Sequence, residues 1–321
     1  MDISIVIPVY NSSSTLRALS KRLHTVLSDT NRKYEIIFVD DESSDDSWQL
    51  LCELQNKHPG SVTVIQLMRN FGQHNALMAG FRYAKGKFVI TMDDDLQNPP
   101  EEIPKLLDTI IENNYDLVYA SYGSKKHAKW RNLGSTLAIK FYQIVFKSDI
   151  AVTSFRVIRR KLLESIFTYN LNYTYIDGLL AWNTRRIGSV EVAHMPRRDG
   201  VSGYSLSKLL LLSVNLFTNF SILPLQFVSI VGLGTALLGI LVGGFYLLQA
   251  LLSDISVPGY ASTITSIMLL GGIQLLALGM IGEYIGRLHI NINRKPQYTI
   301  RQIQPDVNKN SVEDDQNRND S

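Results

Sequence analysis

The sequence predicts an α/β protein with a mostly parallel sheet and helices on both faces, followed by two transmembrane helices. Strand-like and helix-like segments alternate through the first 120 residues with short connections, which is typical of such a sheet. A polar or acidic cluster follows each of the first four predicted strands. Further on, residues 209–253 and 255–282 contain no Asp, Glu, Lys or Arg. Each stretch exceeds the roughly 20 residues that cross a hydrocarbon core.

The composition excludes several classes of protein. The chain has 321 residues and a formal net charge of only +3, which does not indicate a nucleic-acid binder. Its single cysteine, Cys52, excludes an internal disulfide and fits a reducing compartment. The sequence begins directly with a strand-like run, so we expect no cleavable signal peptide.

The predicted strands cover residues 3–8, 34–39, 62–67, 86–90 and 116–120. Apolar residues at helical spacing lie between them, beginning with Leu16, Leu19, Leu23 and Leu27. Ligands of such sheets bind beyond the carboxyl ends of the strands. We therefore expect four strand ends to meet at one edge: Tyr10-Asn11, Asp40-Asp41, Arg69-Asn70 and Asp93 to Asp95. The sequence has neither G-x-G-x-x-G after its first strand nor a P-loop, so a dinucleotide fold and a P-loop enzyme are not supported.

Asp93, Asp94 and Asp95 follow the fourth predicted strand, and three adjacent carboxylates repel one another. A hard divalent cation, Mg²⁺ or Mn²⁺, would make them compatible, because it takes oxygen ligands and shares them with substrate phosphates. Alternation along an extended backbone places Asp93 and Asp95 on one side and Asp94 on the other. The alternative is an acidic turn without a ligand.

Four segments resemble the inverting family-two glycosyltransferases of the GT-A (Rossmann-like) fold: residues 6–11, 39–41, 69–74 and 93–101. More narrowly, the chain resembles bacterial polyprenyl-phosphate glycosyltransferases, relatives of dolichol-phosphate mannose synthase that include bactoprenol glucosyltransferases. The likeness runs from residue 3 to about 300 and includes Gly282-Glu283-Tyr284-Ile285-Gly286-Arg287 in the membrane segment.

The resemblance implies three groups of site residues. Catalytic residues would be Asp93, Asp95, Gln97, Ser154 and Arg156, with Asp93 and Asp95 holding Mg²⁺ or Mn²⁺. The nucleotide would be bound by Pro8, Tyr10, Asn11, Asp40, Asp41, Asn70 and Asp94. The acceptor phosphate would be bound by Arg197, Arg198, Ser202, Tyr204 and Lys208. For each basic residue, Arg156 included, a structural ion pair is the alternative.

The chain departs from the family pattern at three positions. The glycine that usually follows the paired aspartates is Glu42, and the usual lysine of the R-x-x-G-x-S-K-Y loop is Gly203. Ser154 stands where several relatives carry an acidic residue. These departures concern the turn after the second strand, the acceptor phosphate and the catalytic centre.

We expect a cytoplasmic catalytic domain over residues 1–203, an interfacial amphipathic helix over 204–223 and a two-helix membrane hairpin over 224–287. Residues 288–321 would form a cytoplasmic tail, disordered from about 302. Basic residues flank the hairpin on one side (Lys208, Arg287, Arg294 and Lys295), which places both termini in the cytoplasm of a bacterial inner membrane. A buried soluble hairpin is the alternative.

The predicted reaction is transfer of a sugar from a nucleotide diphosphate donor, of which UDP is the first choice, to undecaprenyl phosphate at the cytoplasmic membrane face. The resemblance also implies homo-oligomers and a flippase as a partner. One alternative is a catalytically inactive membrane adaptor that binds nucleotide sugar. Another is a relative of the processive polysaccharide synthases, although their Q-x-x-R-W motif is absent from this sequence.

Overall fold

In the computed structural model the chain divides into two compact units. One unit comprises Met1–Ser202 and Pro296–Ser321, and the other comprises Gly203–Lys295. The structure describes residues 1–122, 152–169, 174–193, 195, 260–292 and 296–305, together with single positions and short runs between 228 and 241. The predicted interfacial helix over 204–223 and most of the first predicted membrane helix lie outside these residues.

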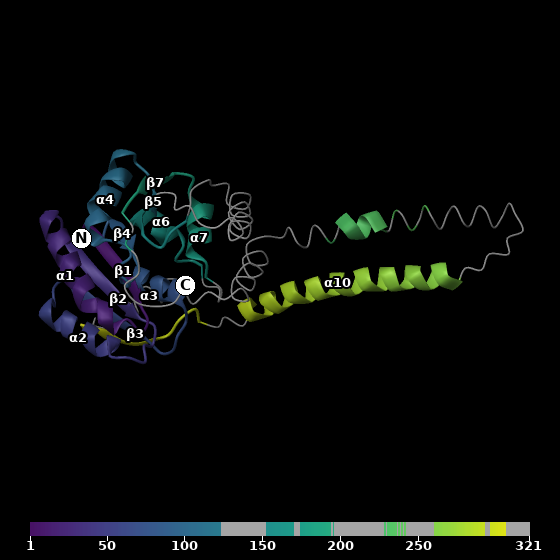
Figure 1. Ribbon diagram of the computed structural model, residues 1–321, viewed down its shortest axis with the longest axis horizontal. Coiled ribbons are helices and arrows are strands. Elements are labelled where there is room, and N and C mark those ends of the chain that lie inside the picture. Colours follow the sequence, from purple (N-terminus) through teal and green to yellow (C-terminus); the bar gives the residue numbers. More distant parts are fainter. Residues whose placement is uncertain are drawn as a thin grey trace, which may run out of the picture. The chain divides into compact units, whose positions relative to one another are not determined.

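The first unit is built on one eight-stranded sheet (Figure 1). Its strands are β1 (Ile3–Val9), β2 (Tyr34–Asp40), β3 (Val62–Leu67), β4 (Phe88–Thr91), β5 (Leu117–Ser121), β6 (Arg156–Arg159), β7 (Ile187–Glu191) and β8 (Ile300–Gln304). Across the sheet their order is β7-β5-β6-β4-β1-β2-β3-β8. The β6 strand runs antiparallel to β4 and β5, and β8 runs antiparallel to β3. The other pairings are parallel, so six strands share one direction, as the sequence predicts.

Helices cover both faces of the sheet. They are α1 (Ser13–Asp29), α2 (Ser47–Lys57), α3 (Gln73–Tyr83), the short 3₁₀ helix η1 (Pro100–Glu102), α4 (Ile103–Glu112), α6 (Arg160–Ser165) and α7 (Ile176–Asn183). The apolar residues of α1, α2 and α4 form one core with Ile5 and Ile7 of β1 and Phe38 of β2. On the opposite face α3 packs against β1 and β2. Helices on both faces are therefore confirmed.

Gly80 explains how α3 lies so close to the sheet. A Cβ atom at this position would lie 2.4 Å from Cγ1 of Val6 and 3.0 Å from Cγ2 of Val39. Glycine is unfavourable inside a helix because it has the largest backbone entropy to lose. Here it removes the side chain that would push α3 away from the sheet. At its first residue, Gln73, α3 reaches Asp93, which follows β4.

The β8 strand is absent from the predicted strands, and the expectation of disorder from about residue 302 is wrong for residues 302–304. These residues belong to β8, which pairs with the edge strand β3. The pairing satisfies backbone groups that an edge strand leaves open. It also part-buries Ile300 and Ile303. Residues 306–321 lie outside the described part of the chain.

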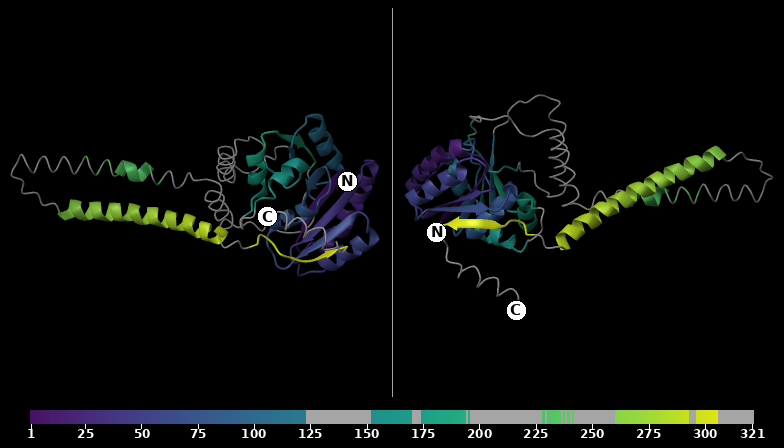
Figure 2. Two further views of the ribbon diagram at one scale, coloured as in Figure 1. Left: turned by 180° about the vertical axis from the view of Figure 1, so that it is seen from behind. Right: turned by 90° about the horizontal axis from the view of Figure 1, so that it is seen from below.

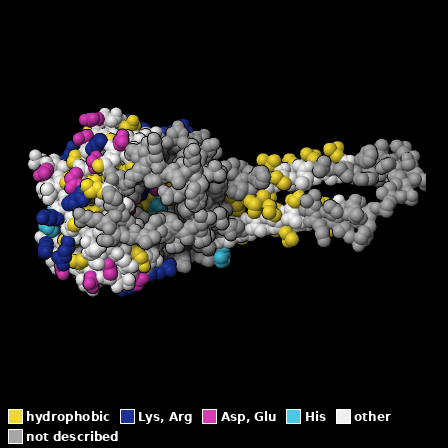
Figure 3. Space-filling view, viewed as in Figure 1, with side chains coloured by type: hydrophobic (Ala, Val, Ile, Leu, Met, Phe, Trp, Pro, Cys, Tyr) yellow, Lys and Arg dark blue, Asp and Glu magenta, His cyan; other side chains and the backbone are white. Residues whose placement is uncertain are grey.

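In the second unit the structure describes α10 (Tyr260–Ile292), a helix of 33 residues. Large apolar side chains are exposed along it, among them Ile267, Leu275, Leu278 and Ile285 (Figure 3). Within the described residues, no helix meets the combined requirement of length and apolarity for crossing a membrane. The two-helix membrane hairpin therefore stays a prediction.

Candidate active site

The sheet brings the four predicted polar strand ends to one edge. Parallel register places Val9 of β1 beside Asp40 of β2, and Asp40 beside Gln66 of β3. On the other side of β1, Val6 pairs with Thr91 of β4, two residues before Asp93. Tyr10, Asn11 and Asn70 are exposed beyond these ends, and Pro8 within β1 is partly buried. The edge itself is where the sequence predicts it.

Asp40 is fully buried, and both of its carboxylate oxygens accept hydrogen bonds from the protein. The backbone N–H of Ser43 donates to Oδ1 over 3.2 Å, and Nε2 of Gln66 donates to Oδ2 over 3.2 Å. Ser43 in turn accepts a hydrogen bond from the N–H of Asn11 through its Oγ, at 2.9 Å. Asp40 therefore holds the loop after β2 against the loop after β1.

Asp41 has a similar role on the other side. The backbone N–H groups of Phe71 and Gly72 donate to its two carboxylate oxygens over 2.7 and 2.8 Å. Burial raises the pKa of Asp41 above its ordinary value, and these two hydrogen bonds oppose that rise. Gly72 has a φ of +87°, a conformation that glycine adopts without steric cost. The sequence predicts that Asp40 and Asp41 bind the nucleotide; in the structure their carboxylates accept hydrogen bonds from Gln66 and from the loops after β2 and β3.

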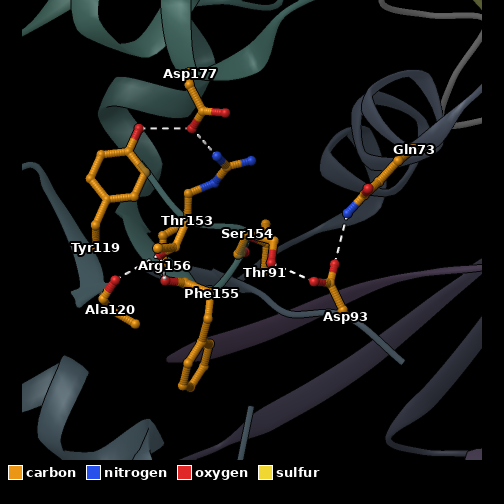
Figure 4. Close-up of polar contacts among 10 residues, drawn as sticks. All are labelled: Gln73, Thr91, Asp93, Tyr119, Ala120, Thr153, Ser154, Phe155, Arg156 and Asp177. Carbon is orange, nitrogen blue, oxygen red and sulfur yellow. Dashed lines mark hydrogen bonds and ion pairs between the residues drawn. The ribbon is translucent and has the colours of Figure 1, made fainter. Parts of the chain in front are cut away.

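Asp93 is held from two sides by neutral donors (Figure 4). Nε2 of Gln73, the first residue of α3, donates to Oδ1 over 2.7 Å. The hydroxyl of Ser154 donates to Oδ2. Burial raises the pKa of Asp93, the Ser154 hydrogen bond lowers it and the nearby charge of Asp95 raises it again. The negative charges of Asp93 and Asp95 repel each other, and a cation bound between two carboxylates would reduce this repulsion.

Asp94 faces different neighbours from Asp93. Its carboxylate interacts with the Ser12 hydroxyl and the backbone N–H of Tyr10, at the end of β1. Burial raises the pKa of Asp94 to about 6. Oδ1 of Asp95 accepts a hydrogen bond from the N–H of Gln97 over 3.1 Å, which closes a turn. The predicted alternation between Asp93 and Asp94 is therefore visible in their contacts.

The loop after Asp95 contains an unusual backbone conformation. Leu96 has a φ of +62°, which is rare for a branched side chain and costs conformational energy. Glu42, in the loop after β2, also has a positive φ, of +60°, which is uncommon for a residue other than glycine, asparagine or aspartate. Both residues lie at the candidate edge. The remaining positive-φ residues other than glycine in the described part of the chain are asparagines, which tolerate this region.

Two neighbours of the carboxylates were missed in the sequence. Tyr122 follows β5, and its hydroxyl donates to Oδ1 of Asn98 over 2.6 Å. Burial, together with the charges of Asp93 and Asp95, raises the pKa of Tyr122 to about 12, so its hydroxyl stays protonated. Gln73 lies in the motif after the third strand. Both follow strand ends at the same edge, a signal that the sequence contained.

Arg156, predicted as a catalytic residue, is buried within the first unit. It is 1% exposed, on β6, and its guanidinium forms an ion pair with Asp177 of α7 (Figure 4). The Tyr119 hydroxyl donates to the same Asp177 oxygen over 2.8 Å. The carboxylate of Asp177 supplies the counter-charge that a buried guanidinium requires, while Nε of Arg156 has no hydrogen-bond partner among the described residues. This pair is the structural ion pair that the sequence leaves open as the alternative for Arg156.

The predicted acceptor-phosphate residues (Arg197, Arg198, Ser202, Tyr204 and Lys208) lie outside the described residues. The nearest described position is Met195, whose N–H donates to the carbonyl oxygen of Gln97 over 2.9 Å. Among the described residues no three His, Cys, Asp or Glu side chains gather as a metal site. Asp93 and Asp95 remain as a carboxylate pair, and Mg²⁺ is bound in many proteins by one or two carboxylates plus phosphate oxygens and water. The pair fits such an ion.

Comparison with known proteins decides the family. Residues 4–167 match the profile of Glycosyl transferase family 2. The chain belongs to this family. Members with curated names are similar to this glycosyltransferase over nearly its whole length. Undecaprenyl-phosphate 4-deoxy-4-formamido-L-arabinose transferase of Aeromonas hydrophila is 35% identical over 306 residues, covering 94% of this chain and 93% of the relative. The protein of the same name from Serratia proteamaculans is 34% identical over 318 residues and covers 97% of both chains.

A solved structure supports the GT-A fold of the glycosyltransferase. Glucosyl-3-phosphoglycerate synthase from Mycobacterium tuberculosis, in complex with Mn²⁺, UDP and phosphoglyceric acid, superposes with a TM-score of 0.51. The two sequences are 18% identical, and the match covers 68% of this chain and 76% of that one. The likeness shows the fold of the catalytic unit. The sequence prediction of a GT-A fold is confirmed.

Proposed function

We propose that this glycosyltransferase moves a sugar from a nucleotide diphosphate donor, UDP-linked in our first choice, to undecaprenyl phosphate, with inversion at the anomeric carbon. The observation that carries the proposal is the Asp93–Asp95 carboxylate pair at the carboxyl edge of the sheet. That edge is where α/β enzymes bind their substrates. The relatives' names supply the acceptor, because they are undecaprenyl-phosphate sugar transferases similar over more than nine-tenths of this chain.

The donor would lie across the ends of β1 to β4. Tyr10, 51% exposed, offers an aromatic ring to the nucleoside, and Pro8, Asn11 and Asn70 lie on the same edge. Asp40 and Asp41 would contribute by fixing the two loops, and Asp94 by fixing the end of β1. Gln97, which follows the carboxylates, would lie near the sugar.

Asp93 and Asp95 would hold Mg²⁺ or Mn²⁺ on the donor diphosphate. A bound divalent ion neutralises negative charge that develops on a leaving diphosphate. The fold relative from Mycobacterium tuberculosis was crystallised with Mn²⁺ and UDP together. Gln73 and Ser154 are neutral donors that orient Asp93, and the one cationic side chain that acts on its carboxylate among the described residues, Arg156, is itself paired with Asp177. The orientation of Asp93 is therefore set before a cation binds.

The nucleophile would be an oxygen of the lipid phosphate. Its attack forms the bond to the anomeric carbon while the bond from that carbon to the diphosphate oxygen breaks, releasing nucleoside diphosphate. A phosphate monoester has a second pKa near ~6 and is largely ionised at neutral pH, so it needs no strong protein base. Ser154, which cannot act as such a base, is compatible with this chemistry. Attack opposite the leaving group inverts the anomeric centre.

A lipid acceptor requires a site at a membrane surface. The exposed apolar side chains of α10 and the charge-free segments around it favour contact with a bilayer. Basic residues precede the first charge-free segment and follow the second. By the positive-inside rule, the catalytic unit would lie on the cytoplasmic side of a bacterial inner membrane. Arg197, Arg198, Ser202, Tyr204 and Lys208, close in sequence to the first segment, would bind the acceptor phosphate.

The test is transfer by the purified full-length protein in detergent micelles with undecaprenyl phosphate and Mg²⁺ or Mn²⁺. UDP-, GDP- and dTDP-sugars are offered in parallel, together with nucleotide-linked 4-deoxy-4-formamido-L-arabinose. We expect a lipid-linked sugar from one donor, lost with EDTA and restored by added metal. Nucleotide binding without a lipid product from any donor would instead support an inactive adaptor.

A further inference from the structure

We infer that β8 positions the loop after β2. Its Arg301 would be a positioning residue for nucleotide binding that acts through Glu42. This rests on the proposed function, since the loop after β2 surrounds the proposed nucleotide site. The β8 strand lies beside β3 at the edge of the sheet (Figure 2). Arg301 contacts Glu42 and Met68, which follow β2 and β3, and Gln302 contacts Gln66 within β3.

The first contact is direct. Nη2 of Arg301 donates to the carbonyl oxygen of Met68 over 2.9 Å and lies 3.4 Å from Oε1 of Glu42. Met68 follows β3, and its own N–H donates to the carbonyl oxygen of Thr299 over 2.8 Å. One guanidinium thus links the loop after β2 with the loop after β3. Arginine suits this role because its fork of N–H donors can bind two acceptors in fixed geometry.

The second contact is a relay. Nε2 of Gln302 donates to Oε1 of Gln66 over 3.0 Å, and Nε2 of Gln66 donates to Oδ2 of Asp40 over 3.2 Å. A carboxylate only accepts, so Gln66 must present its amide nitrogen to Asp40 and its carbonyl oxygen to Gln302. Gln302 must then donate. The β8 strand therefore orders the side chain that supports Asp40, and Asp40 holds the N–H of Ser43.

Both contacts converge on the segment from Asp40 to Ser43. Within it, Glu42 has a φ of +60°, a conformation that glycine would adopt without cost. Glycine is the residue that the family pattern has at this position, and here a glutamate takes the same backbone shape. Its side chain then reaches Arg301. We interpret the Glu42–Arg301 pair as what holds the loop in shape where glycine is missing.

The experiment compares Arg301→Gln with Arg17→Gln in the full-length protein. Arg17 forms an exposed ion pair with Glu53 on α1 and α2, so the control makes the same charge change on a similar surface pair. The first readout is hydrogen exchange at the backbone amides of Ser43 and Ser44. The second is the dissociation constant for UDP, GDP or dTDP in the presence of Mn²⁺, whichever the wild type binds.

We expect faster exchange at these amides and about fivefold weaker nucleotide binding in Arg301→Gln, with kcat at saturating donor unchanged. Arg17→Gln should match the wild type in both readouts. A merely structural role would lower thermal stability and the active fraction and leave the dissociation constant unchanged. Unchanged exchange, or faster exchange with unchanged affinity, overturns the inference.

A double-mutant cycle separates the inference from the proposed function. In a Glu42→Gly background the loop has its glycine, so Arg301→Gln should weaken nucleotide binding less than it does beside Glu42. Equal losses in both backgrounds would contradict the link through Glu42. If the wild type binds none of the three nucleotides, the proposed function fails. The hydrogen-exchange rates of the same variants then test by themselves whether the Glu42–Arg301 pair holds the loop after β2.

A same-strand pair tests the relay. Gln302→Glu places an acceptor against the carbonyl oxygen of Gln66, whereas Gln304→Glu makes the same change opposite Val64, which has no polar side chain. We expect faster exchange at the Ser43 amide in Gln302→Glu and wild-type exchange in Gln304→Glu. The same exchange rate in both variants would contradict the relay.

Discussion

The hydroxyl of Ser154 donates a hydrogen bond to Oδ2 of Asp93, the carboxylate at the centre of the candidate site. The family resemblance implies an acidic residue at this position in several relatives, and a second carboxylate there would repel Asp93. The hydroxyl instead supplies a donor. At this position the glycosyltransferase thus has a hydrogen-bond donor in place of a charged group, and this donor orients Asp93.

Removing that hydroxyl should reduce transfer. Ser154→Ala leaves Oδ2 of Asp93 without its donor, and hydrogen bonds to charged groups contribute about 1.5–3 kcal/mol. We expect kcat/KM for the donor to fall about tenfold or more. Ser154→Thr keeps a hydroxyl and should retain most of the activity. Equal activities of the alanine and threonine variants would show that the hydrogen bond has no role in transfer.

Asp41 should be required for stability. Asp41→Asn leaves one acceptor oxygen and turns an amide donor toward the N–H of Phe71 or Gly72, so one buried N–H loses its partner. We expect the free energy of unfolding to fall by about 2–3 kcal/mol, measured by urea unfolding followed by fluorescence. Asp108→Asn, an exposed change on α4, should leave it unchanged. A loss no larger than that of the Asp108 control would contradict the role of Asp41 in holding the loop before α3.

Variants of the Arg156–Asp177 pair test whether Arg156 has a structural or a catalytic role. Asp177→Asn leaves a buried guanidinium without its counter-charge and should cost about 3–5 kcal/mol of stability. The double variant Arg156→Met/Asp177→Leu removes both charges and should be more stable than Asp177→Asn. It should also retain measurable transfer activity. A stable double variant with no activity would restore Arg156 as a catalytic candidate.

The stability of the catalytic unit should depend on pH through His24. Burial, and then the charge of His58, lower the pKa of His24 below its ordinary 6.5, and the two rings stack with centroids 3.9 Å apart. The unfolded chain therefore takes up a proton that the folded protein resists, so stability is full above pH 6.5 and falls as the pH drops toward the folded pKa.

The measurement for His24 is the change in thermal midpoint between pH 7.5 and pH 5.5. His24→Gln should lose less stability over this interval than the wild type. Identical shifts in wild type and His24→Gln would contradict the role of this histidine.

Much of the fold follows from local pattern. The first five strands and the edge at which they end could be predicted because β-branched runs and polar strand ends are local signals. The β8 strand could not, since its five residues pair with a strand more than 230 positions earlier in the sequence. The sequence of a short segment does not indicate which distant edge strand it pairs with.

The site divides in the same way. The residue types at the edge follow from motifs, but their partners are set by packing. Asp41 was predicted beside the nucleotide, and only the fold shows that it binds the N–H groups of the loop before α3. The resemblance assigns Arg156 to the catalytic residues, and its ion pair with Asp177 is visible only in the fold because Asp177 lies on a separate helix. A motif gives a residue's neighbourhood and leaves its contacts open.

The central claim is that Asp93 and Asp95 form the catalytic centre of sugar transfer to a polyprenyl phosphate. The most direct measurement is formation of the lipid-linked sugar by purified wild type, Asp95→Asn and Asp108→Asn, each with the donor that the wild type uses. We predict that Asp95→Asn loses at least about a hundredfold in kcat/KM while keeping its fold, and that Asp108→Asn equals the wild type. Wild-type transfer by Asp95→Asn, or no lipid product from the wild type with any donor, would contradict the account.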